Sequence, residues 1–186
     1  YIYNPLGYQT SITYPDSTVG KVEFAPNGFG QPQQAIRPNG TYASNATYYP
    51  TGSLDTFTYG NGITHKTTLN SRNLPSKIHD YKGNANTLKL SYSYDNQNNV
   101  TKITDGVNSQ YSITALTYDG LDRLKSTTGN SGIGHTSLEY DALGNITKYF
   151  NKTHSLSYSY NLTTNRLNSI NDTGSQNRDY NFASGY

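Results

Sequence analysis

The chain has 186 residues and a mass of 20.6 kDa, and its 14 Lys and Arg against 12 Asp and Glu give a formal net charge of +2. The basic residues are scattered singly, which argues against binding to a nucleic-acid backbone. The absence of cysteine excludes disulfides and thiolate metal sites. No stretch approaches the roughly 18 consecutive apolar residues of a membrane helix, so we expect no membrane span.

Tyrosine dominates the apolar part of the composition. Hydrophobic residues reach only 32% of the chain, and 19 tyrosines make up a large share of them. Because Tyr packs its ring but keeps a hydroxyl that needs a partner, we expect half-buried, amphipathic faces. The aromatic content of 13% and the charged content of only 14% argue against disorder. The composition therefore favours a thin sheet wall over a deep Leu/Ile core.

One short pattern recurs from end to end: an aromatic residue, a residue that tolerates a positive φ four positions later, and an apolar residue two positions after that. We count nine copies, which start at Tyr3, Phe24, Tyr48, Leu69, Tyr94, Tyr118, Tyr140, Tyr160 and Tyr180. The starts lie 20 to 25 residues apart. A period in this range is typical of repeat architectures.

The first copies carry glycine at the turn position. Gly7, Gly28 and Gly52 each stand four residues after the aromatic, and glycine adopts a positive φ at no steric cost. The copy at Leu69 is degraded, and its register is uncertain by one residue. Over residues 88–94, Leu and Tyr alternate with Lys and Ser, which predicts a half-buried strand.

The later copies replace the glycine but keep its chemistry. Asp95, Asp119 and Asp141 follow their aromatic residues and can start a turn by bonding the backbone two residues on. The turn position is then Asn98, Asp122 or Gly144, all residue types that tolerate a positive φ. In the Tyr160 copy, one inserted residue moves the apolar position to Leu167, and the Tyr180 copy, with Gly185, is cut off.

These elements predict an all-β fold, a spiral of antiparallel β-hairpins built from repeats of about 22 residues, which would form a partial β-shell or β-tube. No stretch holds a helical apolar period for three turns. We expect one array over residues 1–186, truncated at both ends, with no separate catalytic domain. The residues that define the repeat are predicted to be Tyr3, Gly7, Phe24, Gly28, Tyr48, Gly52, Tyr94, Asp95, Tyr118, Asp119, Tyr140, Asp141, Gly144 and Tyr160.

The pattern resembles that of the RHS, or YD-repeat, proteins, whose loose consensus is Tyr-Asp-x-x-Gly-Arg-Leu. Residues 118–124 and 140–146 match it best, and residues 59–63, Tyr-Gly-Asn-Gly-Ile, also resemble a recurring segment of these proteins. The resemblance implies a secreted or cell-surface bacterial protein whose hollow shell encloses a toxin or partner domain. A conserved Asp/Pro/Gly-rich plug with self-cleaving aspartates, usual in the family, has no counterpart here.

Enzymatic chemistry is not expected, and we predict no catalytic residue, no cofactor and no metal. The four histidines lie far apart and none stands in a metal-binding spacing. Asp95, Asp119 and Asp141 could be imagined as paired carboxylates for glycosidic hydrolysis, but their recurrence at one turn position favours turn formation. Gly60-Asn61-Gly62 and Gly132-Ile133-Gly134 lack the third glycine of a phosphate loop.

The sequence leaves three roles open. The first is a non-catalytic segment of a toxin-encapsulating shell, and the second is an extracellular structural or adhesive fibre. In both, open strand edges would pair with other segments of the array or with neighbouring chains. The third is a carbohydrate-binding surface, in which exposed tyrosines such as Tyr92 or Tyr158 would stack on glycans.

Overall fold

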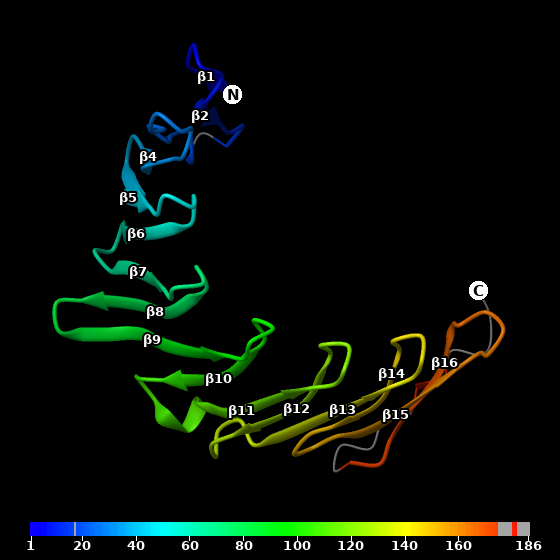
Figure 1. Cartoon of the computed structure of the whole chain (residues 1–186). Helices are drawn as coiled ribbons and strands as arrows, with labels where there is room; N and C mark the ends of the chain where they lie inside the picture. Colours follow the sequence, from blue (N-terminus) through cyan, green and yellow to red (C-terminus); the bar gives the residue numbers. More distant parts are fainter. Residues whose placement is uncertain (17, 175–179, 182–186) are drawn as a thin grey trace. The chain divides into compact units, whose positions relative to one another are not determined.

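The computed structural model describes residues 1–16, 18–174 and 180–181 of the chain (Figure 1). Within these residues the strands pair antiparallel with their neighbours in chain order, and the only helix is one 3-10 turn, η1 (Ser109–Tyr111). The prediction of an all-β fold made of successive antiparallel hairpins is therefore confirmed.

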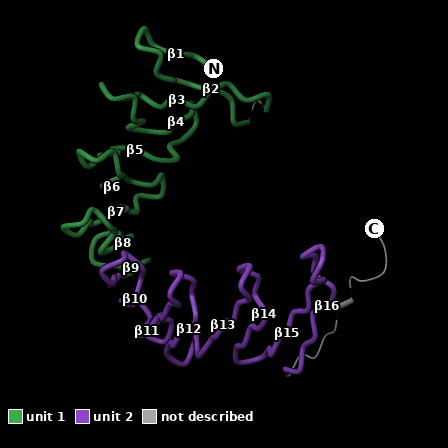
Figure 2. Tube along the Cα trace, turned by 45° about the vertical axis from the view of Figure 1, so that its right-hand side comes forward, with its two compact units in different colours: residues 1–91 green, residues 92–186 purple. Residues whose placement is uncertain are grey.

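The chain divides into two compact units, residues 1–91 and residues 92–186 (Figure 2). The first unit contains β1 (Ile2–Tyr3), β2 (Gln9–Thr13), β3 (Lys21–Glu23), β4 (Ala35–Arg37), β5 (Gly40–Tyr48), β6 (Leu54–Tyr59), β7 (Thr64–Leu69) and β8 (Pro75–Lys82). Strand β9 (Ala85–Tyr94) begins in the first unit and ends in the second. The second unit contains β10 (Val100–Asp105), β11 (Ile113–Tyr118), β12 (Leu124–Gly129), β13 (His135–Tyr140), β14 (Ile146–Phe150), β15 (Ser155–Tyr160), β16 (Leu167–Asp172) and β17 (Tyr180–Asn181).

The aromatic residue that ends one strand pairs with the apolar residue that opens the next. The pairs are Tyr48 with Leu54, Tyr118 with Leu124, Tyr140 with Ile146 and Tyr160 with Leu167. In each hairpin the register shifts immediately before this pair. A bulge of this kind bends the strand and increases its twist where the turn begins. The repeated pair contributes roughly 0.2–1 kcal/mol per hairpin.

The strands are half-buried, as their alternation predicted. In β9 the side chains of Leu90 and Tyr92 are half-buried, whereas Ser91 and Ser93 are exposed. Only Val22 and Ala46 are fully buried apolar residues in the part of the chain that the structure describes. The fold is therefore stabilised by one semi-apolar sheet face and by hydrogen bonds rather than by a deep core, in agreement with the composition.

Candidate functional site

The repeated turn is closed by two backbone hydrogen bonds and one side chain. In the seventh copy, the Asp141 N–H donates to the Asn145 carbonyl (3.0 Å) and the Gly144 N–H donates to the Asp141 carbonyl (3.2 Å). The Asp141 Oδ1 atom accepts the N–H groups of Leu143 and Asn145, both at 2.9 Å. One side chain thus satisfies two backbone donors inside the loop. The same two side-chain bonds recur at Asn4, Asn27, Asn70, Asp95 and Asp119.

The turn position of the repeat has a left-handed backbone, as its residue types led us to expect. The φ angle is 79° at Gly7, 87° at Gly52, 72° at Asn98, 57° at Asp122 and 89° at Gly144. Asn165 takes this position in the longer loop of the eighth copy, with φ 55°. Glycine, Asn and Asp are the residue types that adopt this conformation with the least strain.

The predicted register of the second copy, with Phe24 as its aromatic and Gly28 as its turn glycine, needs correction. Gly28 does not have a positive φ; Gly30 does, at 81°. The turn starts at Asn27, whose N–H donates to the Gln31 carbonyl, and Pro26 bridges to Pro32 where other copies pair an aromatic with an apolar residue. Because proline replaces the tyrosine, the aromatic signal pointed to the wrong residue.

The copy at Leu69, which is degraded in sequence, folds into a complete turn. Asn70 accepts the N–H groups of Arg72 and Leu74 at 2.9 and 3.0 Å, and Asn73 has φ 59°. Its register is therefore settled with Leu69 in the aromatic position. In the last copy, Tyr180 lies in β17 and Gly185 lies outside the described residues.

In several copies a tyrosine hydroxyl ties the hairpin to the one before it. Tyr118, Tyr140 and Tyr160 donate at 2.8, 2.8 and 3.0 Å to the carbonyls of Val100, Leu124 and Ile146. Each acceptor opens the return strand of the preceding hairpin. Tyr48 does the same with the Pro32 carbonyl, at 2.6 Å. Burial raises the pKa of the Tyr118 and Tyr160 hydroxyls, so they stay protonated as donors.

A second set of bonds joins neighbouring turns through the residue that follows the positive-φ position. Asn99 Nδ2 donates to Asp122 Oδ1 of the next turn at 2.8 Å, and Asn145 Nδ2 donates to Asn165 Oδ1 at 2.7 Å. Arg123 Nη1 reaches the Asp141 carbonyl of the next turn at 3.3 Å. We call these contacts the turn ladder, and each of Asn99, Arg123 and Asn145 a rung residue. The ladder couples each turn of this series to the next.

Two turn-forming carboxylates, Asp119 and Asp141, are stabilised in their ionised form by rung residues of their own turns. Arg123 bonds the Asp119 side chain through Nε and Nη2, both at 2.7 Å, and its guanidinium lies 4.4 Å from the centre of the Tyr140 ring. The hydrogen bond from Arg123 holds the pKa of Asp119 below its usual range, and the bond from Asn145 does the same to the pKa of Asp141. Both carboxylates are used in turn formation, which explains their recurrence.

Two histidines pair with aspartates, which sequence spacing did not indicate. His65 Nδ1 lies 2.6 Å from Asp80 Oδ1 across β7 and β8, and its Nε2 lies 3.2 Å from Thr67 Oγ1. His154 Nδ1 lies 2.6 Å from Asp172 Oδ2. Asp172 is 1% exposed and also accepts two backbone N–H groups, so this pair fixes the loop between β14 and β15.

The order Thr67, His65, Asp80 matches that of a nucleophile, base and orienting acid. These three residues lie on the paired strands β7 and β8, so their contacts join the two strands. Phe57 also stacks on the His65 imidazole, with 4.9 Å between the ring centres. The cluster is best described as a cross-strand hydrogen-bond network.

The described residues include no group of three or more His, Asp or Glu side chains placed to hold a metal. They also contain no helix of the length and hydropathy that crossing a bilayer requires. Tyr92 and Tyr158, predicted as exposed stacking platforms, are half-buried, and burial raises the pKa of both hydroxyls. Their limited exposure therefore does not support the hypothesis that these two tyrosines stack on glycans.

The rung position was the feature that the sequence concealed. Its occupants include Tyr8, Gln31, Arg123 and the two asparagines Asn99 and Asn145, so no single residue type marks the position. The signal that could have revealed it is positional, because each of these residues directly follows the residue in the left-handed conformation.

Comparison with solved structures agrees with the fold. The Photorhabdus luminescens Tc holotoxin pore matches 97% of this chain at a TM-score of 0.61 and 20% identity, and TcdB2-TccC3-Cdc42 matches 95% at 0.60 and 18%. TcdB2-TccC3 itself matches 95% at 0.59 and 20%. The chain spans 9% of the length of each of these proteins. They are Tc toxin complexes that contain RHS/YD-repeat shells, so the predicted resemblance is confirmed at the level of the fold.

No protein-family model and no curated protein sequence matches the chain.

Proposed function

We propose that the chain is a non-catalytic wall segment of an RHS/YD-repeat β-shell, which encloses a toxin or partner domain of a secreted or cell-surface protein. The wall would keep the enclosed chain away from water, proteases and targets. In this proposal the partners are other segments of the same array and the enclosed domain.

The observation that carries the proposal is the direction of the inter-hairpin bonds. The hydroxyls of Tyr118, Tyr140 and Tyr160 bond the preceding hairpin. The rung residues Asn99 and Asn145 bond both their own turn and the next one. The residues that recur are therefore used for building a wall. The fold likeness to Tc toxin complexes over 95% or more of the chain supports the same role.

A structural or adhesive fibre is the second candidate, and the first strand favours it. In β1, Ile2 is 51% exposed and Tyr3 is 56% exposed, and β2 is the strand that pairs with it. An exposed apolar edge recruits further strands unless it is covered. In a fibre, that strand would come from another chain.

Electron microscopy of the protein purified from its source, without refolding, distinguishes the two. The shell proposal expects closed hollow particles, and protease treatment of intact particles should leave an internal polypeptide uncut until the particles are opened by denaturant. Continuous filaments that repeat along one axis would contradict the shell and support the fibre. Isolated monomers without a protected polypeptide would contradict both.

A further inference from the structure

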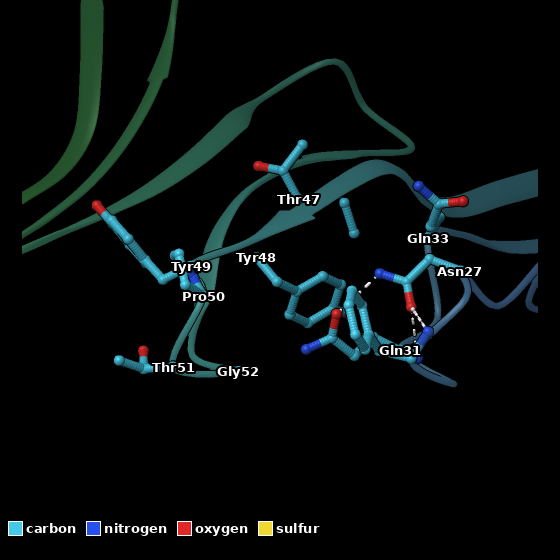
Figure 3. Close-up of a pocket in the computed structure, with 11 residues that line it drawn as sticks. Asn27, Gln31, Gln33, Thr47, Tyr48, Tyr49, Pro50, Thr51 and Gly52 are labelled. Atoms are coloured by element: carbon cyan, nitrogen blue, oxygen red, sulfur yellow. Dashed lines mark hydrogen bonds between the residues drawn. The ribbon is translucent and has the colours of Figure 1, made fainter.

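A groove of about 660 Å³ separates the second and third turns of the first unit (Figure 3). Its walls include Asn27, Phe29 and Gln31 from one turn and Tyr48 and Gly52 from the next. In the close-up, Tyr48 lies beside Asn27 and Gln31, while Tyr49 points away from them. The volume is in the range of small-molecule sites, which is about 300–1,000 Å³.

The groove lies where the turn ladder lacks a bond. Gln31 is the rung residue of its turn, and its Nε2 lies 3.7 Å from the place where a Cβ on Gly52 would stand. In later copies the equivalent position of the next turn is Asp122 or Asn165, whose Oδ1 accepts the rung bond. Gly52 has no side chain to accept it.

The Gln31 amide is fixed but not saturated. Its Oε1 accepts Asn27 Nδ2 at 2.8 Å, and Asn27 is itself held by the N–H groups of Phe29 and Gln31. Among the described residues, none accepts from Gln31 Nε2. Gln31 lines the groove with its amide held by Asn27, so its Nε2 is a pre-positioned donor for a ligand.

Two aromatic rings complete the walls. Tyr48 is half-buried, and its hydroxyl is bound to the Pro32 carbonyl at 2.6 Å, so the ring is held in place. Phe29 is 86% exposed at the turn tip. Leu6, Leu121 and Leu143 are also exposed at this loop position, whereas in the second copy the exposed side chain is an aromatic ring that lines a groove beside polar groups.

The lining carries no charge. Besides the aromatic rings, the residues that line it are amides, a buried alanine, a proline, a glycine and the hydroxyls of Thr47 and Thr51. A ligand for this surface needs hydroxyls that bond amides and a face of C–H groups that packs on aromatic rings, without ionic groups. Neutral sugars have both features. We propose that the groove between the second and third turns binds a neutral oligosaccharide.

The site differs from the tyrosines considered in the sequence, because it uses Phe29, Gln31 and Tyr48 rather than Tyr92 and Tyr158. It does not rest on the shell proposal, because every residue that lines the groove belongs to two neighbouring turns of this chain.

Calorimetric titration of the 186-residue chain with cellotetraose, maltotetraose and tetra-N-acetylchitotetraose tests the proposal. We expect at least one of them to bind with Kd below ~10 mM, and Phe29→Ala to raise that Kd by about tenfold or more. Phe29 is exposed, so the variant should keep the circular dichroism spectrum of the parent. Leu143→Ala, at the same loop position of a later copy and 75% exposed, is the matched control and should leave Kd unchanged.

Gly52→Asn tests the missing rung. Asn tolerates the positive φ, as Asn98 and Asn165 do in this chain, and it supplies the acceptor that Gln31 lacks. We expect it to fold and to lose oligosaccharide binding. Absence of binding by the parent protein to all three sugars would overturn the proposal. Binding that survives both Phe29→Ala and Gly52→Asn would place the sugar elsewhere and overturn it as well.

Discussion

At the scale of single residues, the recurring Tyr and Asp have separate roles. The Asp carboxylate satisfies donors within its own turn, whereas the Tyr hydroxyl reaches the preceding hairpin. An Asp can be replaced by Asn, as the copies at Asn4, Asn27 and Asn70 demonstrate, because only an acceptor oxygen is needed. A Tyr hydroxyl has no such substitute among the aromatic residues.

Replacing Tyr140 by Phe should lower the free energy of unfolding by about 1 kcal/mol, the net value of a typical hydrogen bond. The change removes the bond to the Leu124 carbonyl but keeps the ring beside Arg123. Tyr111→Phe is the control, since no partner of its hydroxyl is found among the described residues. Urea denaturation measures both, and equal losses in the two variants would contradict the assigned role.

Acid should weaken the turns through Asp141. Its pKa is lowered in the fold by the hydrogen bond from Asn145, so its contribution is full above the ordinary carboxyl pKa, about 3.9, and is lost as the pH falls through the folded value. Asp141→Asn keeps an acceptor for the backbone but cannot titrate. We expect the thermal midpoint of the variant to fall less steeply with acidification than that of the parent; parallel curves would refute this.

At the scale of elements, the hairpin is defined by its left-handed loop position, and the ladder joins one hairpin to the next. The loop position accepts Gly, Asn or Asp because the backbone conformation excludes bulky side chains. At Gly30 a further restriction applies, since a Cβ would stand 2.7 Å from the Tyr8 ring. Gly30 is therefore restricted both by its own left-handed backbone and by the Tyr8 ring of the neighbouring repeat.

Gly144→Val should destabilise the protein by about 1–2 kcal/mol more than Gly144→Asn, because a β-branched residue resists the φ of 89°. Both variants add a side chain near Arg123, whose Nη1 would lie 3.9 Å from the new Cβ. The difference between them includes the backbone effect and any bond that the Asn side chain accepts from Arg123, as Asn165 accepts one from Asn145. Denaturation midpoints that coincide would show that the loop relaxes and that the position is not restricted.

A double-mutant cycle on Asn145 and Asn165 measures one rung of the ladder. Asn145→Ala removes the donor, and Asn165→Gly removes the acceptor while it keeps the positive φ. We expect a coupling energy of about 0.5–1 kcal/mol between the two changes. Strict additivity of the two losses would mean that the rung does not stabilise neighbouring turns.

At the scale of the whole molecule, stability in a repeat array is a sum of terms within repeats and between neighbours. The scarcity of fully buried apolar residues fits this view, because the described residues form no central core that a deletion would destroy. Tyrosine hydroxyls and rungs then add to the strand pairing between repeats, such as that of β12 with β13, as terms between neighbours.

Removal of residues 119–140 deletes one full period and rejoins Tyr118 to Asp141 in the same motif. We expect the shortened chain to keep its β spectrum and to lose roughly a tenth of its urea m-value, in proportion to the surface removed. The control deletes residues 119–129, half a period that contains β12. It joins the end of β11 to the loop before β13, which starts at the opposite end of the sheet, and should abolish cooperative unfolding. If both deletions behaved alike, the repeat would not be the structural unit.

The sequence by itself determined the fold class and most of the turns. Alternation, Asp or Asn after the aromatic, and a Gly-like residue act through hydrogen bonds within five residues, so they can be recognised without a structure. The Leu69 copy illustrates this, since Asn70 and Asn73 preserve the local chemistry although the aromatic is lost. The second copy marks the limit, because Pro26 hides a turn that Asn27 and Gly30 still form.

Only the tertiary structure decided which turns meet. The pairing of Gln31 with Gly52, of Asn145 with Asn165 and of His65 with Asp80 depends on strand registers that bring residues 15 to 21 positions apart into contact. The three pairs have no residue combination in common, so composition cannot reveal them. The turn ladder and the groove at its open rung follow from that long-range register, whereas each turn follows from its own few residues.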